Sequence, residues 1–486
     1  MPAKAHLASL IASARAQRDA GAWAAAARLY SAANDIDSSL YDVKHNLALC
    51  HLGKGSFDET LQFTAQALAL KPDLWQSHLL RAKVHRARGQ VERADDALTH
   101  VLKYDPSNGT ALLAMADLDM NEYGDAVGAR ERVAPLLRVE QHRADAELTT
   151  LMSKLYDRDE TDQELSDALM DFARRELVMP GFAYSPEALA GVTNRTGRKR
   201  VGLLSPLFCV SPVYFFTIAA FRAMAQKCDL VILNRGTRED WATQAFRDIA
   251  HEWHNVQNLA SPALANAIKR QNIDVLFDLG GWMDPAGLKA LSVKPARKMY
   301  KWVGGQSATT GLTTFDGFIT DDAQSPPGSE RLHSEPLIRI PGGYVTYTPP
   351  PYIPKPSTAP RQGVAVVGNP AKISCAMLEA LPKHGTNFNF IDRRYKYAKS
   401  RNRIQGKFKY QQRFITPITH QDYLNTILRY DNFLDTFPYN CGLTCVEILI
   451  LGLHITEFTG SIFSSRHSVS HKLCFMQKNN SQTGEF

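Results

Sequence analysis

The sequence lacks an apolar stretch long enough to cross a membrane. Its longest apolar runs, residues 210–224 and 445–455, are shorter than the roughly 20 residues that a spanning helix needs. The first residues also lack the apolar core and small-residue cleavage site of a signal peptide, and their pattern indicates an amphipathic helix. We therefore expect a cytoplasmic protein that has no membrane partner.

Cysteine is scarce and irregularly spaced. The seven cysteines are an odd number, only Cys441 and Cys445 lie close together, and no histidine pair accompanies them. This pattern excludes a disulfide framework and a zinc-ligand motif. We expect reduced, buried thiols instead.

The chain has no strong excess of one charge, because 56 Lys and Arg face 49 Asp and Glu, for a net charge of +7. That balance permits acidic partners without requiring nucleic acid. The exception is residues 391–413, where nine Lys and Arg follow one another with no acid from 393 onward. Interleaved aromatic residues leave an RNA contact open. A solvated or partly mobile linker is the favoured interpretation, so a nucleic-acid partner is not expected, and some of these cations could add a positive rim to a cleft.

The first third of the chain repeats with a period of 34 residues, which is the tetratricopeptide period. The positions that keep this step are Gly21, Gly55 and Gly89; Trp23, Phe57 and Val91; Ala14, Ala48, Ala82 and Ala116; and Pro72 and Pro106. Small alanines let paired helices approach, glycine relieves the turn, and proline ends the second helix. A fourth unit, about 109–142, is looser because Gly124 comes one residue late. Such arrays present a groove for extended peptides, so we expect protein or peptide partners.

From residue 199 onward, short apolar strands alternate with helices. The expected strands are 200–205, 229–234, 273–281, 298–305 and 315–321, with helices at about 212–226 and around Leu264 and Ile268. A segment with six prolines, 348–362, then interrupts the pattern and indicates a linker. The alternation restarts with strands at 363–369, 387–392, 413–418 and 431–437. This order predicts two parallel, doubly wound sheets with a cleft between them.

We therefore divide the chain into five segments. They are tetratricopeptide repeats (1–145), a helical connector (146–198), an N-terminal Rossmann-like domain (199–347), the proline-rich linker (348–362) and a C-terminal Rossmann-like domain that binds a nucleotide sugar (363–486).

Residues 433–452 hold the most informative pattern. A strand ends at Asp435, a polar turn with Asn440 and Gly442 follows, and a helix begins near Thr444. Free amide groups at a helix N-terminus form a natural site for a diphosphate. Glu447, in the first turn, could accept a hydrogen bond from a ribose hydroxyl or could serve Thr444 as a capping-box partner.

Lys372 follows a strand at the mouth of the next helix. A cation at this place could neutralise a leaving diphosphate. A solvated surface lysine is the alternative.

The ordered set of segments IDVLFDLGGW, PARKMYKWVGGQSATTG, FITDDAQSP, LDTFPYNCGLTCVEILILG and SSRHSVSHKL resembles the O-linked N-acetylglucosamine transferases, especially bacterial ones. The resemblance runs from about residue 10 to 473. It implies a tetratricopeptide α-solenoid followed by a GT-B pair of Rossmann-like domains. It further implies UDP-GlcNAc as donor, Ser or Thr of proteins as acceptor, inversion at the anomeric carbon, and neither metal nor cofactor.

The resemblance also implies roles for individual residues. Those expected at the donor are Lys372 on the diphosphate, Asn369 beside it, Thr444 on phosphate, Glu447 on the ribose, and His420 and Tyr423 at the nucleoside. From the turn pattern before Thr444, we also expect Asn440 to bind the nucleotide sugar.

The chain departs from the family pattern at three positions. Ser211, which we expect with Lys372 at the catalytic position, stands where the family has a histidine. Lys269 stands at a second family histidine, and Leu443 replaces the first of two threonines. The chain also ends soon after residue 473, where family members continue with helices that close back over the first Rossmann unit. We therefore expect a possibly truncated C-terminal domain. An inactive repeat scaffold that still binds UDP, and a transferase for another UDP-sugar, stay open as alternatives.

Overall fold

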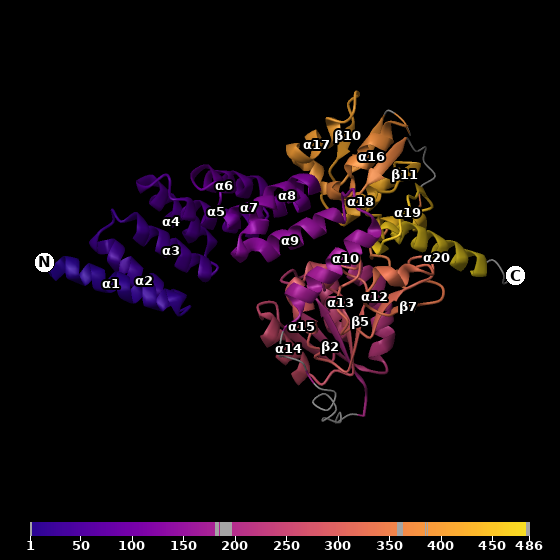
Figure 1. Ribbon diagram of the computed structural model, residues 1–486, viewed down its shortest axis with the longest axis horizontal. Coiled ribbons are helices and arrows are strands. Elements are labelled where there is room, and N and C mark those ends of the chain that lie inside the picture. Colours follow the sequence, from indigo (N-terminus) through magenta and orange to yellow (C-terminus); the bar gives the residue numbers. More distant parts are fainter. Residues whose placement is uncertain are drawn as a thin grey trace. The chain divides into compact units, whose positions relative to one another are not determined.

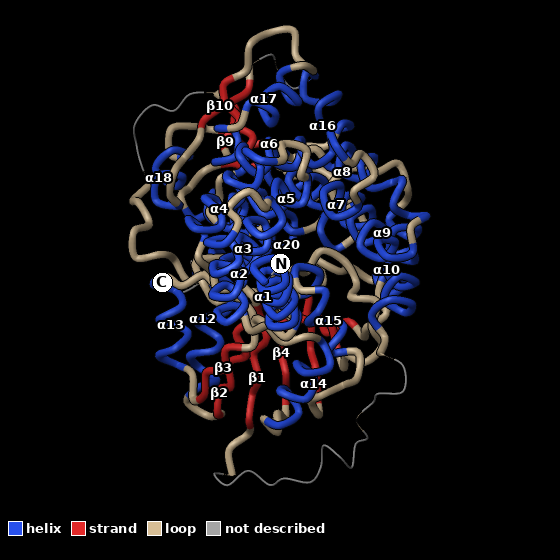
Figure 2. Tube along the Cα trace, turned by 90° about the vertical axis from the view of Figure 1, so that its left-hand side faces the viewer, coloured by secondary structure: helices blue, strands red, loops and turns tan. Residues whose placement is uncertain are grey.

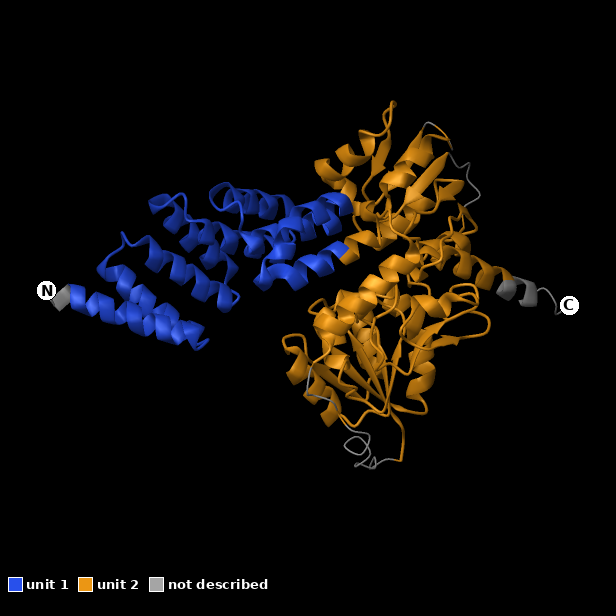
Figure 3. Ribbon diagram, in the orientation of Figure 1, with its two compact units in different colours: residues 1–150 blue, residues 151–486 orange. Residues whose placement is uncertain are grey.

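The computed structural model describes residues 2–179, 184, 197–356, 363–383, 385 and 387–482. It divides into two compact units, Met1–Thr150 and Leu151–Phe486, which Figure 3 shows in different colours. In the described part of the chain, none of the helices has the length and apolar character that crossing a membrane requires.

The first unit is an array of paired helices (Figure 1). They are α1 (Pro2–Asp19), α2 (Trp23–Ile36), α3 (Tyr41–Gly53), α4 (Phe57–Leu70), α5 (Trp75–Ala87), α6 (Val91–Tyr104), α7 (Gly109–Leu118) and α8 (Ala126–Val133), followed by α9 (Glu140–Lys154), which continues into the second unit. The repeated glycines separate the helices of a pair with φ of 74°, 74° and 67° at Gly21, Gly55 and Gly89. The repeated alanines are buried between the helices. The predicted repeats are confirmed.

The looser fourth repeat has a local cause. A π-helical turn, Asp119–Tyr123, follows α7 and widens the helix by one residue before Gly124, whose φ is 74°. The Asp125 amide donates to the Asp119 carbonyl at 2.7 Å and closes this turn. The extra residue explains why Gly124 comes late in the period.

The second unit contains two parallel sheets. The first, which we call the N-terminal sheet, has the order β3-β2-β1-β4-β5-β6-β7. Its strands are β1 (Arg200–Ser205), β2 (Asp229–Asn234), β3 (Glu252–Asn255), β4 (Val275–Asp278), β5 (Lys298–Lys301), β6 (Gly317–Thr320) and β7 (Leu337–Arg339). The five predicted strands are present, whereas the two edge strands, β3 and β7, were not predicted.

Helices cover both faces of the N-terminal sheet. α12 (Pro212–Ala225) and α13 (Trp241–Ile249) lie to one side of the strands, and α14 (Ser261–Arg270) and α15 (Pro285–Leu291) lie to the other (Figure 2). α12 is apolar around most of its circumference because it is buried against the sheet. The carboxyl ends of the strands are left open by this arrangement.

The C-terminal sheet has the order β10-β9-β8-β11-β12, again all parallel. Its strands are β8 (Val364–Val367), β9 (Phe388–Ile391), β10 (Arg413–Ile415), β11 (Asn432–Leu434) and β12 (His454–Thr456). Its helices are α16 (Cys375–Ala380), α17 (Ala398–Gln405), α18 (His420–Ile427) and α19 (Leu443–Ile450). The predicted four strands are confirmed, and β12 is an additional edge strand.

The basic segment is folded, which makes its interpretation as a mobile linker wrong. After a 3₁₀ turn, Arg393–Lys396, it forms α17 and then β10. Tyr395 and Ile404 are fully buried in the core of the C-terminal sheet. The arginines and lysines therefore surround an apolar anchor. Of the proline-rich linker, residues 348–356 are described and 357–362 lie outside the described residues.

α20 (His467–Gln482) carries the chain back to the N-terminal sheet. The His471 ring lies 5.3 Å from that of Phe216 on α12, and the Ser470 hydroxyl donates to Asp321 at 2.7 Å. The sequence analysis did not predict this helix or its packing against the first sheet. The sequence of α20, HSVSHKLCFMQKNNSQ, is largely polar and gives little sign of a packed face.

The connector contains α10 (Asp162–Phe172), which starts with a capping box between Thr161 and Glu164. One carboxylate oxygen of Asp162 accepts the amides of Ser461 and Ile462, both at 2.8 Å. The connector is thereby joined to the loop that precedes α20.

Candidate functional site

A cavity of about 810 Å³ lies where the two sheets of the second unit face each other. On the N-terminal side it is lined by residues that follow β1 and β2, and on the C-terminal side by residues that follow β8, β9, β10 and β11. These are the carboxyl ends of parallel strands, where open sheets of this type bind ligands. The predicted cleft between the sheets is present.

Lys372 lies at the end of a short 3₁₀ turn, Pro370–Lys372, that follows β8. Its ammonium donates to the Asn440 carbonyl at 2.8 Å and lies 4.2 Å from the centroid of the Tyr439 ring. Within the described residues, Lys372 forms no ion pair. Lys372 lines the cavity, and the contacts described for its ammonium are with a carbonyl and an aromatic ring rather than with a carboxylate.

The N-terminus of α19 opens into the same cavity. Gly442 is its N-cap, so no side chain caps the helix, and its first amides have no acceptor within the helix. Thr444 is its second residue and lines the cavity together with Lys372. The structure thus brings together the lysine and the helix terminus that the sequence suggested separately.

Glu447 lies one turn into α19, and only 1% of the residue is exposed. It accepts a hydrogen bond from His420 Nε2 at 2.7 Å, and Nδ1 of that ring lies 3.0 Å from the Tyr352 hydroxyl. Burial raises the pKa of Glu447, and the bond from His420 partly offsets that rise. Since no side chain caps α19, the capping-box alternative for Glu447 was wrong.

Three other predicted residues line the cavity in local roles. The Tyr423 ring stacks on His420 with centroids 5.8 Å apart, and burial raises the pKa of its hydroxyl. The Asn369 side chain accepts the Ala371 amide at 3.1 Å. Ser211 donates to the Leu207 carbonyl at 2.9 Å.

Two residues singled out in the sequence lie elsewhere. Asn440 is fully buried, and its amide donates to the carbonyls of Thr436 and Phe458 at 2.8 and 3.0 Å, so its side chain shapes the turn and does not line the cavity. Only its carbonyl faces Lys372. Lys269 lies on α14, outside the cavity lining, with its ammonium 4.4 Å from the Tyr184 ring centroid.

Sequence reasoning missed an aromatic and acidic wall on the N-terminal side. Trp241 packs edge-on against Tyr352, with ring centroids 6.1 Å apart, and both line the cavity. Asp240 caps α13 and accepts the Val210 amide at 2.9 Å, which joins the loops after β1 and β2. The capping box of Asp240 with Thr243 could have predicted the start of α13 from the sequence. Tyr352 lies in the proline-rich segment, where no local pattern indicates a site residue.

Among the described residues, no group of three or more His, Cys, Asp or Glu is arranged to hold a metal ion.

Comparisons with known proteins agree with this layout. The chain is 24% identical over 369 residues to a probable UDP-N-acetylglucosamine–peptide N-acetylglucosaminyltransferase SPINDLY of Solanum lycopersicum, which covers 69% of this chain and 38% of the relative. A protein of the same name from Arabidopsis thaliana is 26% identical over 303 residues, or 56% of this chain and 32% of the relative. No family model matches the chain.

A solved structure of an O-GlcNAc transferase mutant from Thermobaculum terrenum superposes with a TM-score of 0.59. It is 22% identical and covers 99% of this chain and 87% of the other. The chain is similar to O-GlcNAc transferases. The predicted fold, tetratricopeptide repeats followed by a GT-B pair of sheets, is confirmed by this likeness. The chain spans about two fifths or less of the length of the curated relatives it matches.

Proposed function

We propose that the protein is a glycosyltransferase that moves N-acetylglucosamine from UDP-GlcNAc to Ser or Thr hydroxyls of proteins. The names of its sequence relatives support this class of reaction. The observation that carries the proposal is the interdomain cavity in which the ammonium of Lys372 and the uncapped N-terminus of α19 line one space. Both features stabilise a diphosphate anion.

In the proposed reaction, the acceptor oxygen attacks the anomeric carbon of the sugar. The bond between that carbon and the diphosphate oxygen of UDP breaks at the same time. The configuration inverts, and the diphosphate leaves with the bonding electrons, stabilised by Lys372 and Thr444. The Ser211 hydroxyl donates to the Leu207 carbonyl, so we do not assign it the acceptor proton. We therefore assign the acceptor proton to an oxygen of the departing diphosphate. We propose that this step needs neither metal nor cofactor.

The nucleoside part of the donor would lie against Glu447, His420 and Tyr423. The buried carboxylate of Glu447 accepts a hydrogen bond from His420 with one oxygen, and it can accept a second hydrogen bond from a ribose hydroxyl. The stacked rings of His420 and Tyr423 offer an apolar face to a base.

We propose that the repeat unit binds the protein acceptors. A groove of about 510 Å³ within it is lined by cationic and anionic side chains, including Lys83, Arg86, Asp117 and Asp145. Mixed charges along a groove suit an extended peptide. We further infer a reducing, cytoplasmic setting, since no disulfide joins the cysteines in the described part of the chain.

The first test replaces the lysine. Lys372→Ala should lower turnover of UDP-GlcNAc by about 100-fold or more, the range seen when one preorganised charge is removed, while acceptor-peptide affinity stays unchanged. Lys383→Ala, at an exposed lysine of the same sheet domain, is the matched control. Intact-mass analysis of acceptor proteins measures transfer. If the Lys372 variant transfers sugar as well as the parent, the assigned role is wrong.

An inactive repeat scaffold is less well supported, because the relatives are named as transferases. The chain nevertheless has Ser211 in place of the family histidine and Leu443 in place of a threonine. A turnover assay is therefore needed to decide between a transferase and a scaffold. Titration with UDP, UDP-Glc and UDP-GlcNAc, followed by turnover measurements, separates the alternatives. UDP binding with no turnover supports the scaffold, and turnover with UDP-Glc alone assigns a different sugar.

A further inference from the structure

Tyr439 is a meeting point of three segments that are distant in sequence. Its ring centroid lies 4.2 Å from the Lys372 ammonium, and its hydroxyl lies 3.1 Å from the Ser307 hydroxyl of the N-terminal sheet domain. Tyr156 of the connector stacks on the ring, with centroids 5.1 Å apart and planes within 12°. The ring is fixed on several sides, yet it does not line the cavity itself.

The groups described around the Lys372 ammonium carry no negative charge. They are the Asn440 carbonyl, the face of Tyr439, the nearby His467 and the thiol of Cys441, whose pKa burial raises. Burial holds the pKa of His467 well below its usual value, and His471 and Lys372 lower it further, so this ring is neutral at physiological pH. A carbonyl and a π face attract an ammonium but leave its charge available.

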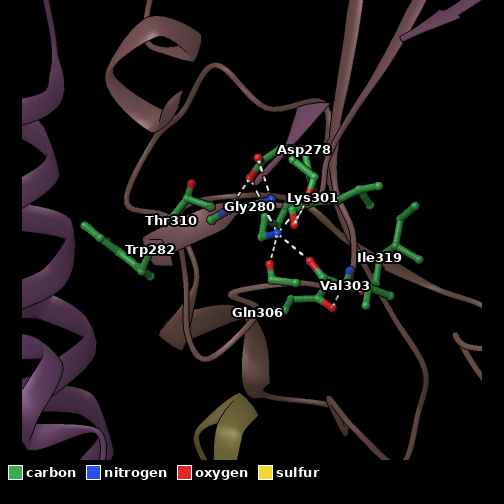
Figure 4. Close-up of polar contacts among 12 residues, drawn as sticks. Asp278, Gly280, Trp282, Lys301, Val303, Gln306, Thr310 and Ile319 are labelled. Carbon is green, nitrogen blue, oxygen red and sulfur yellow. Dashed lines mark hydrogen bonds and ion pairs between the residues drawn. The ribbon is translucent and has the colours of Figure 1, made fainter. Parts of the chain in front are cut away.

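The loop that presents Ser307 is itself fixed from inside the N-terminal sheet domain (Figure 4). The buried ammonium of Lys301 donates to the carbonyls of Val303 and Gly304 at 2.7 and 2.6 Å. The Gln306 side chain accepts the Val303 amide and donates to the Ile319 carbonyl at 2.9 and 2.8 Å. Ser307 therefore gives the Tyr439 hydroxyl a rigid partner.

We propose that Tyr439 is the positioning residue that aims the Lys372 ammonium at the donor diphosphate without neutralising it, and that Ser307 ties this aim to the N-terminal sheet domain. The inference rests on the proposed function. A carboxylate at this place would hold the lysine more strongly, but the diphosphate would then have to compete with it. The aromatic ring avoids that competition because it carries no net charge.

The test compares ligands with and without phosphate on the full chain. Tyr439→Leu, which removes the ring, should weaken UDP binding by about 10-fold, as loss of a partly desolvated cation–π contact predicts. Uridine binding, followed by ligand-observed NMR, should stay unchanged, whereas a general loss of folding would weaken both. Tyr439→Phe keeps the ring and should restore most of the UDP affinity. In a folded Tyr439→Leu variant, unchanged UDP affinity, or equal losses for UDP and uridine, overturns the inference.

A second set of variants keeps the proposal testable if Tyr439→Leu does not fold. Tyr439→Phe and Ser307→Ala each remove the same hydrogen bond, so each should lower kcat by a few fold, and the double variant should be no worse than either one. Additive losses contradict the link through Ser307. A parent that binds no UDP contradicts the proposed function and the inference together, while a parent that transfers sugar but is insensitive to Tyr439→Leu contradicts the inference alone.

Discussion

At the residue scale, the charge of the buried Glu447 side chain is stabilised by one hydrogen-bond partner, His420. Glu447 is buried, and its hydrogen bond to His420 stabilises a carboxylate that burial alone disfavours. The His420 side chain is 21% exposed, so it can move more readily than its partner. The pair is therefore sensitive to loss of the histidine.

We expect His420→Ala to lower the free energy of unfolding by about 2 kcal/mol, because it leaves a buried carboxylate without its partner. Urea denaturation at pH 7 measures the change. In the background of Glu447→Gln, where no buried charge is left, the same substitution should cost less. Equal costs in both backgrounds would show that the ion pair does not matter for stability.

His471 predicts a pH dependence of stability. Burial lowers its pKa from 6.5 to about 4, so the unfolded chain binds a proton between these values and the folded chain does not. Its stabilising contribution is present above pH 6.5 and is lost as the pH falls toward 4, by up to about 3 kcal/mol. His471→Phe, which can pack against Phe216, should flatten the acid side of the stability profile. His251→Phe, at an exposed histidine, should leave the profile unchanged.

The site residues differ in how far the sequence could identify them. Lys372 and Thr444 each lie in a short helical segment that follows a strand, and both line the cavity in the structure. Asn440 has the same local signature, but its side chain is turned inward by two carbonyls that only the folded loop supplies. Tyr352 reaches the site through long-range packing, which no local pattern records.

At the element scale, the central strands could be predicted and the edge strands could not. β1 and β2 are apolar runs buried on both faces, and their predicted bounds match the structure. β3, with the polar sequence EWHN, and the three-residue strands β7 and β12 are paired on one side only. Their pairing depends on a neighbouring strand already in place.

The loop after β5 requires glycine at Gly305. Its φ is 58°, and a Cβ there would lie 2.0 Å from the Gly280 carbonyl oxygen. Gly342 has a φ of 77° with nothing within 4 Å of such a Cβ. We expect Gly342→Ala to cost about 1 kcal/mol from backbone strain alone and Gly305→Ala at least about 3 kcal/mol, because the clash adds to the strain. Urea denaturation of the two variants measures both; equal costs would mean that the loop relaxes freely.

At the scale of the whole molecule, the repeat array and the two-sheet unit have separate cores. All residues that line the interdomain cavity fall between 210 and 447, within the second unit. The fragment 151–486 should therefore bind UDP with unchanged affinity in calorimetry and should lose transfer to protein acceptors while keeping donor hydrolysis. Loss of UDP binding by a folded fragment would show that the repeats contribute to the donor site.

α20 belongs to the C-terminal half by chain connection and to the N-terminal sheet by packing. The His471 ring lies against Phe216 and stacks with Tyr344, while Ser470 bonds Asp321. A motion that separates the two sheets would have to break this buried aromatic contact or bend the chain beside α20. On the proposed function, release of the nucleotide would be coupled to a helix that contributes no residue to the cavity lining.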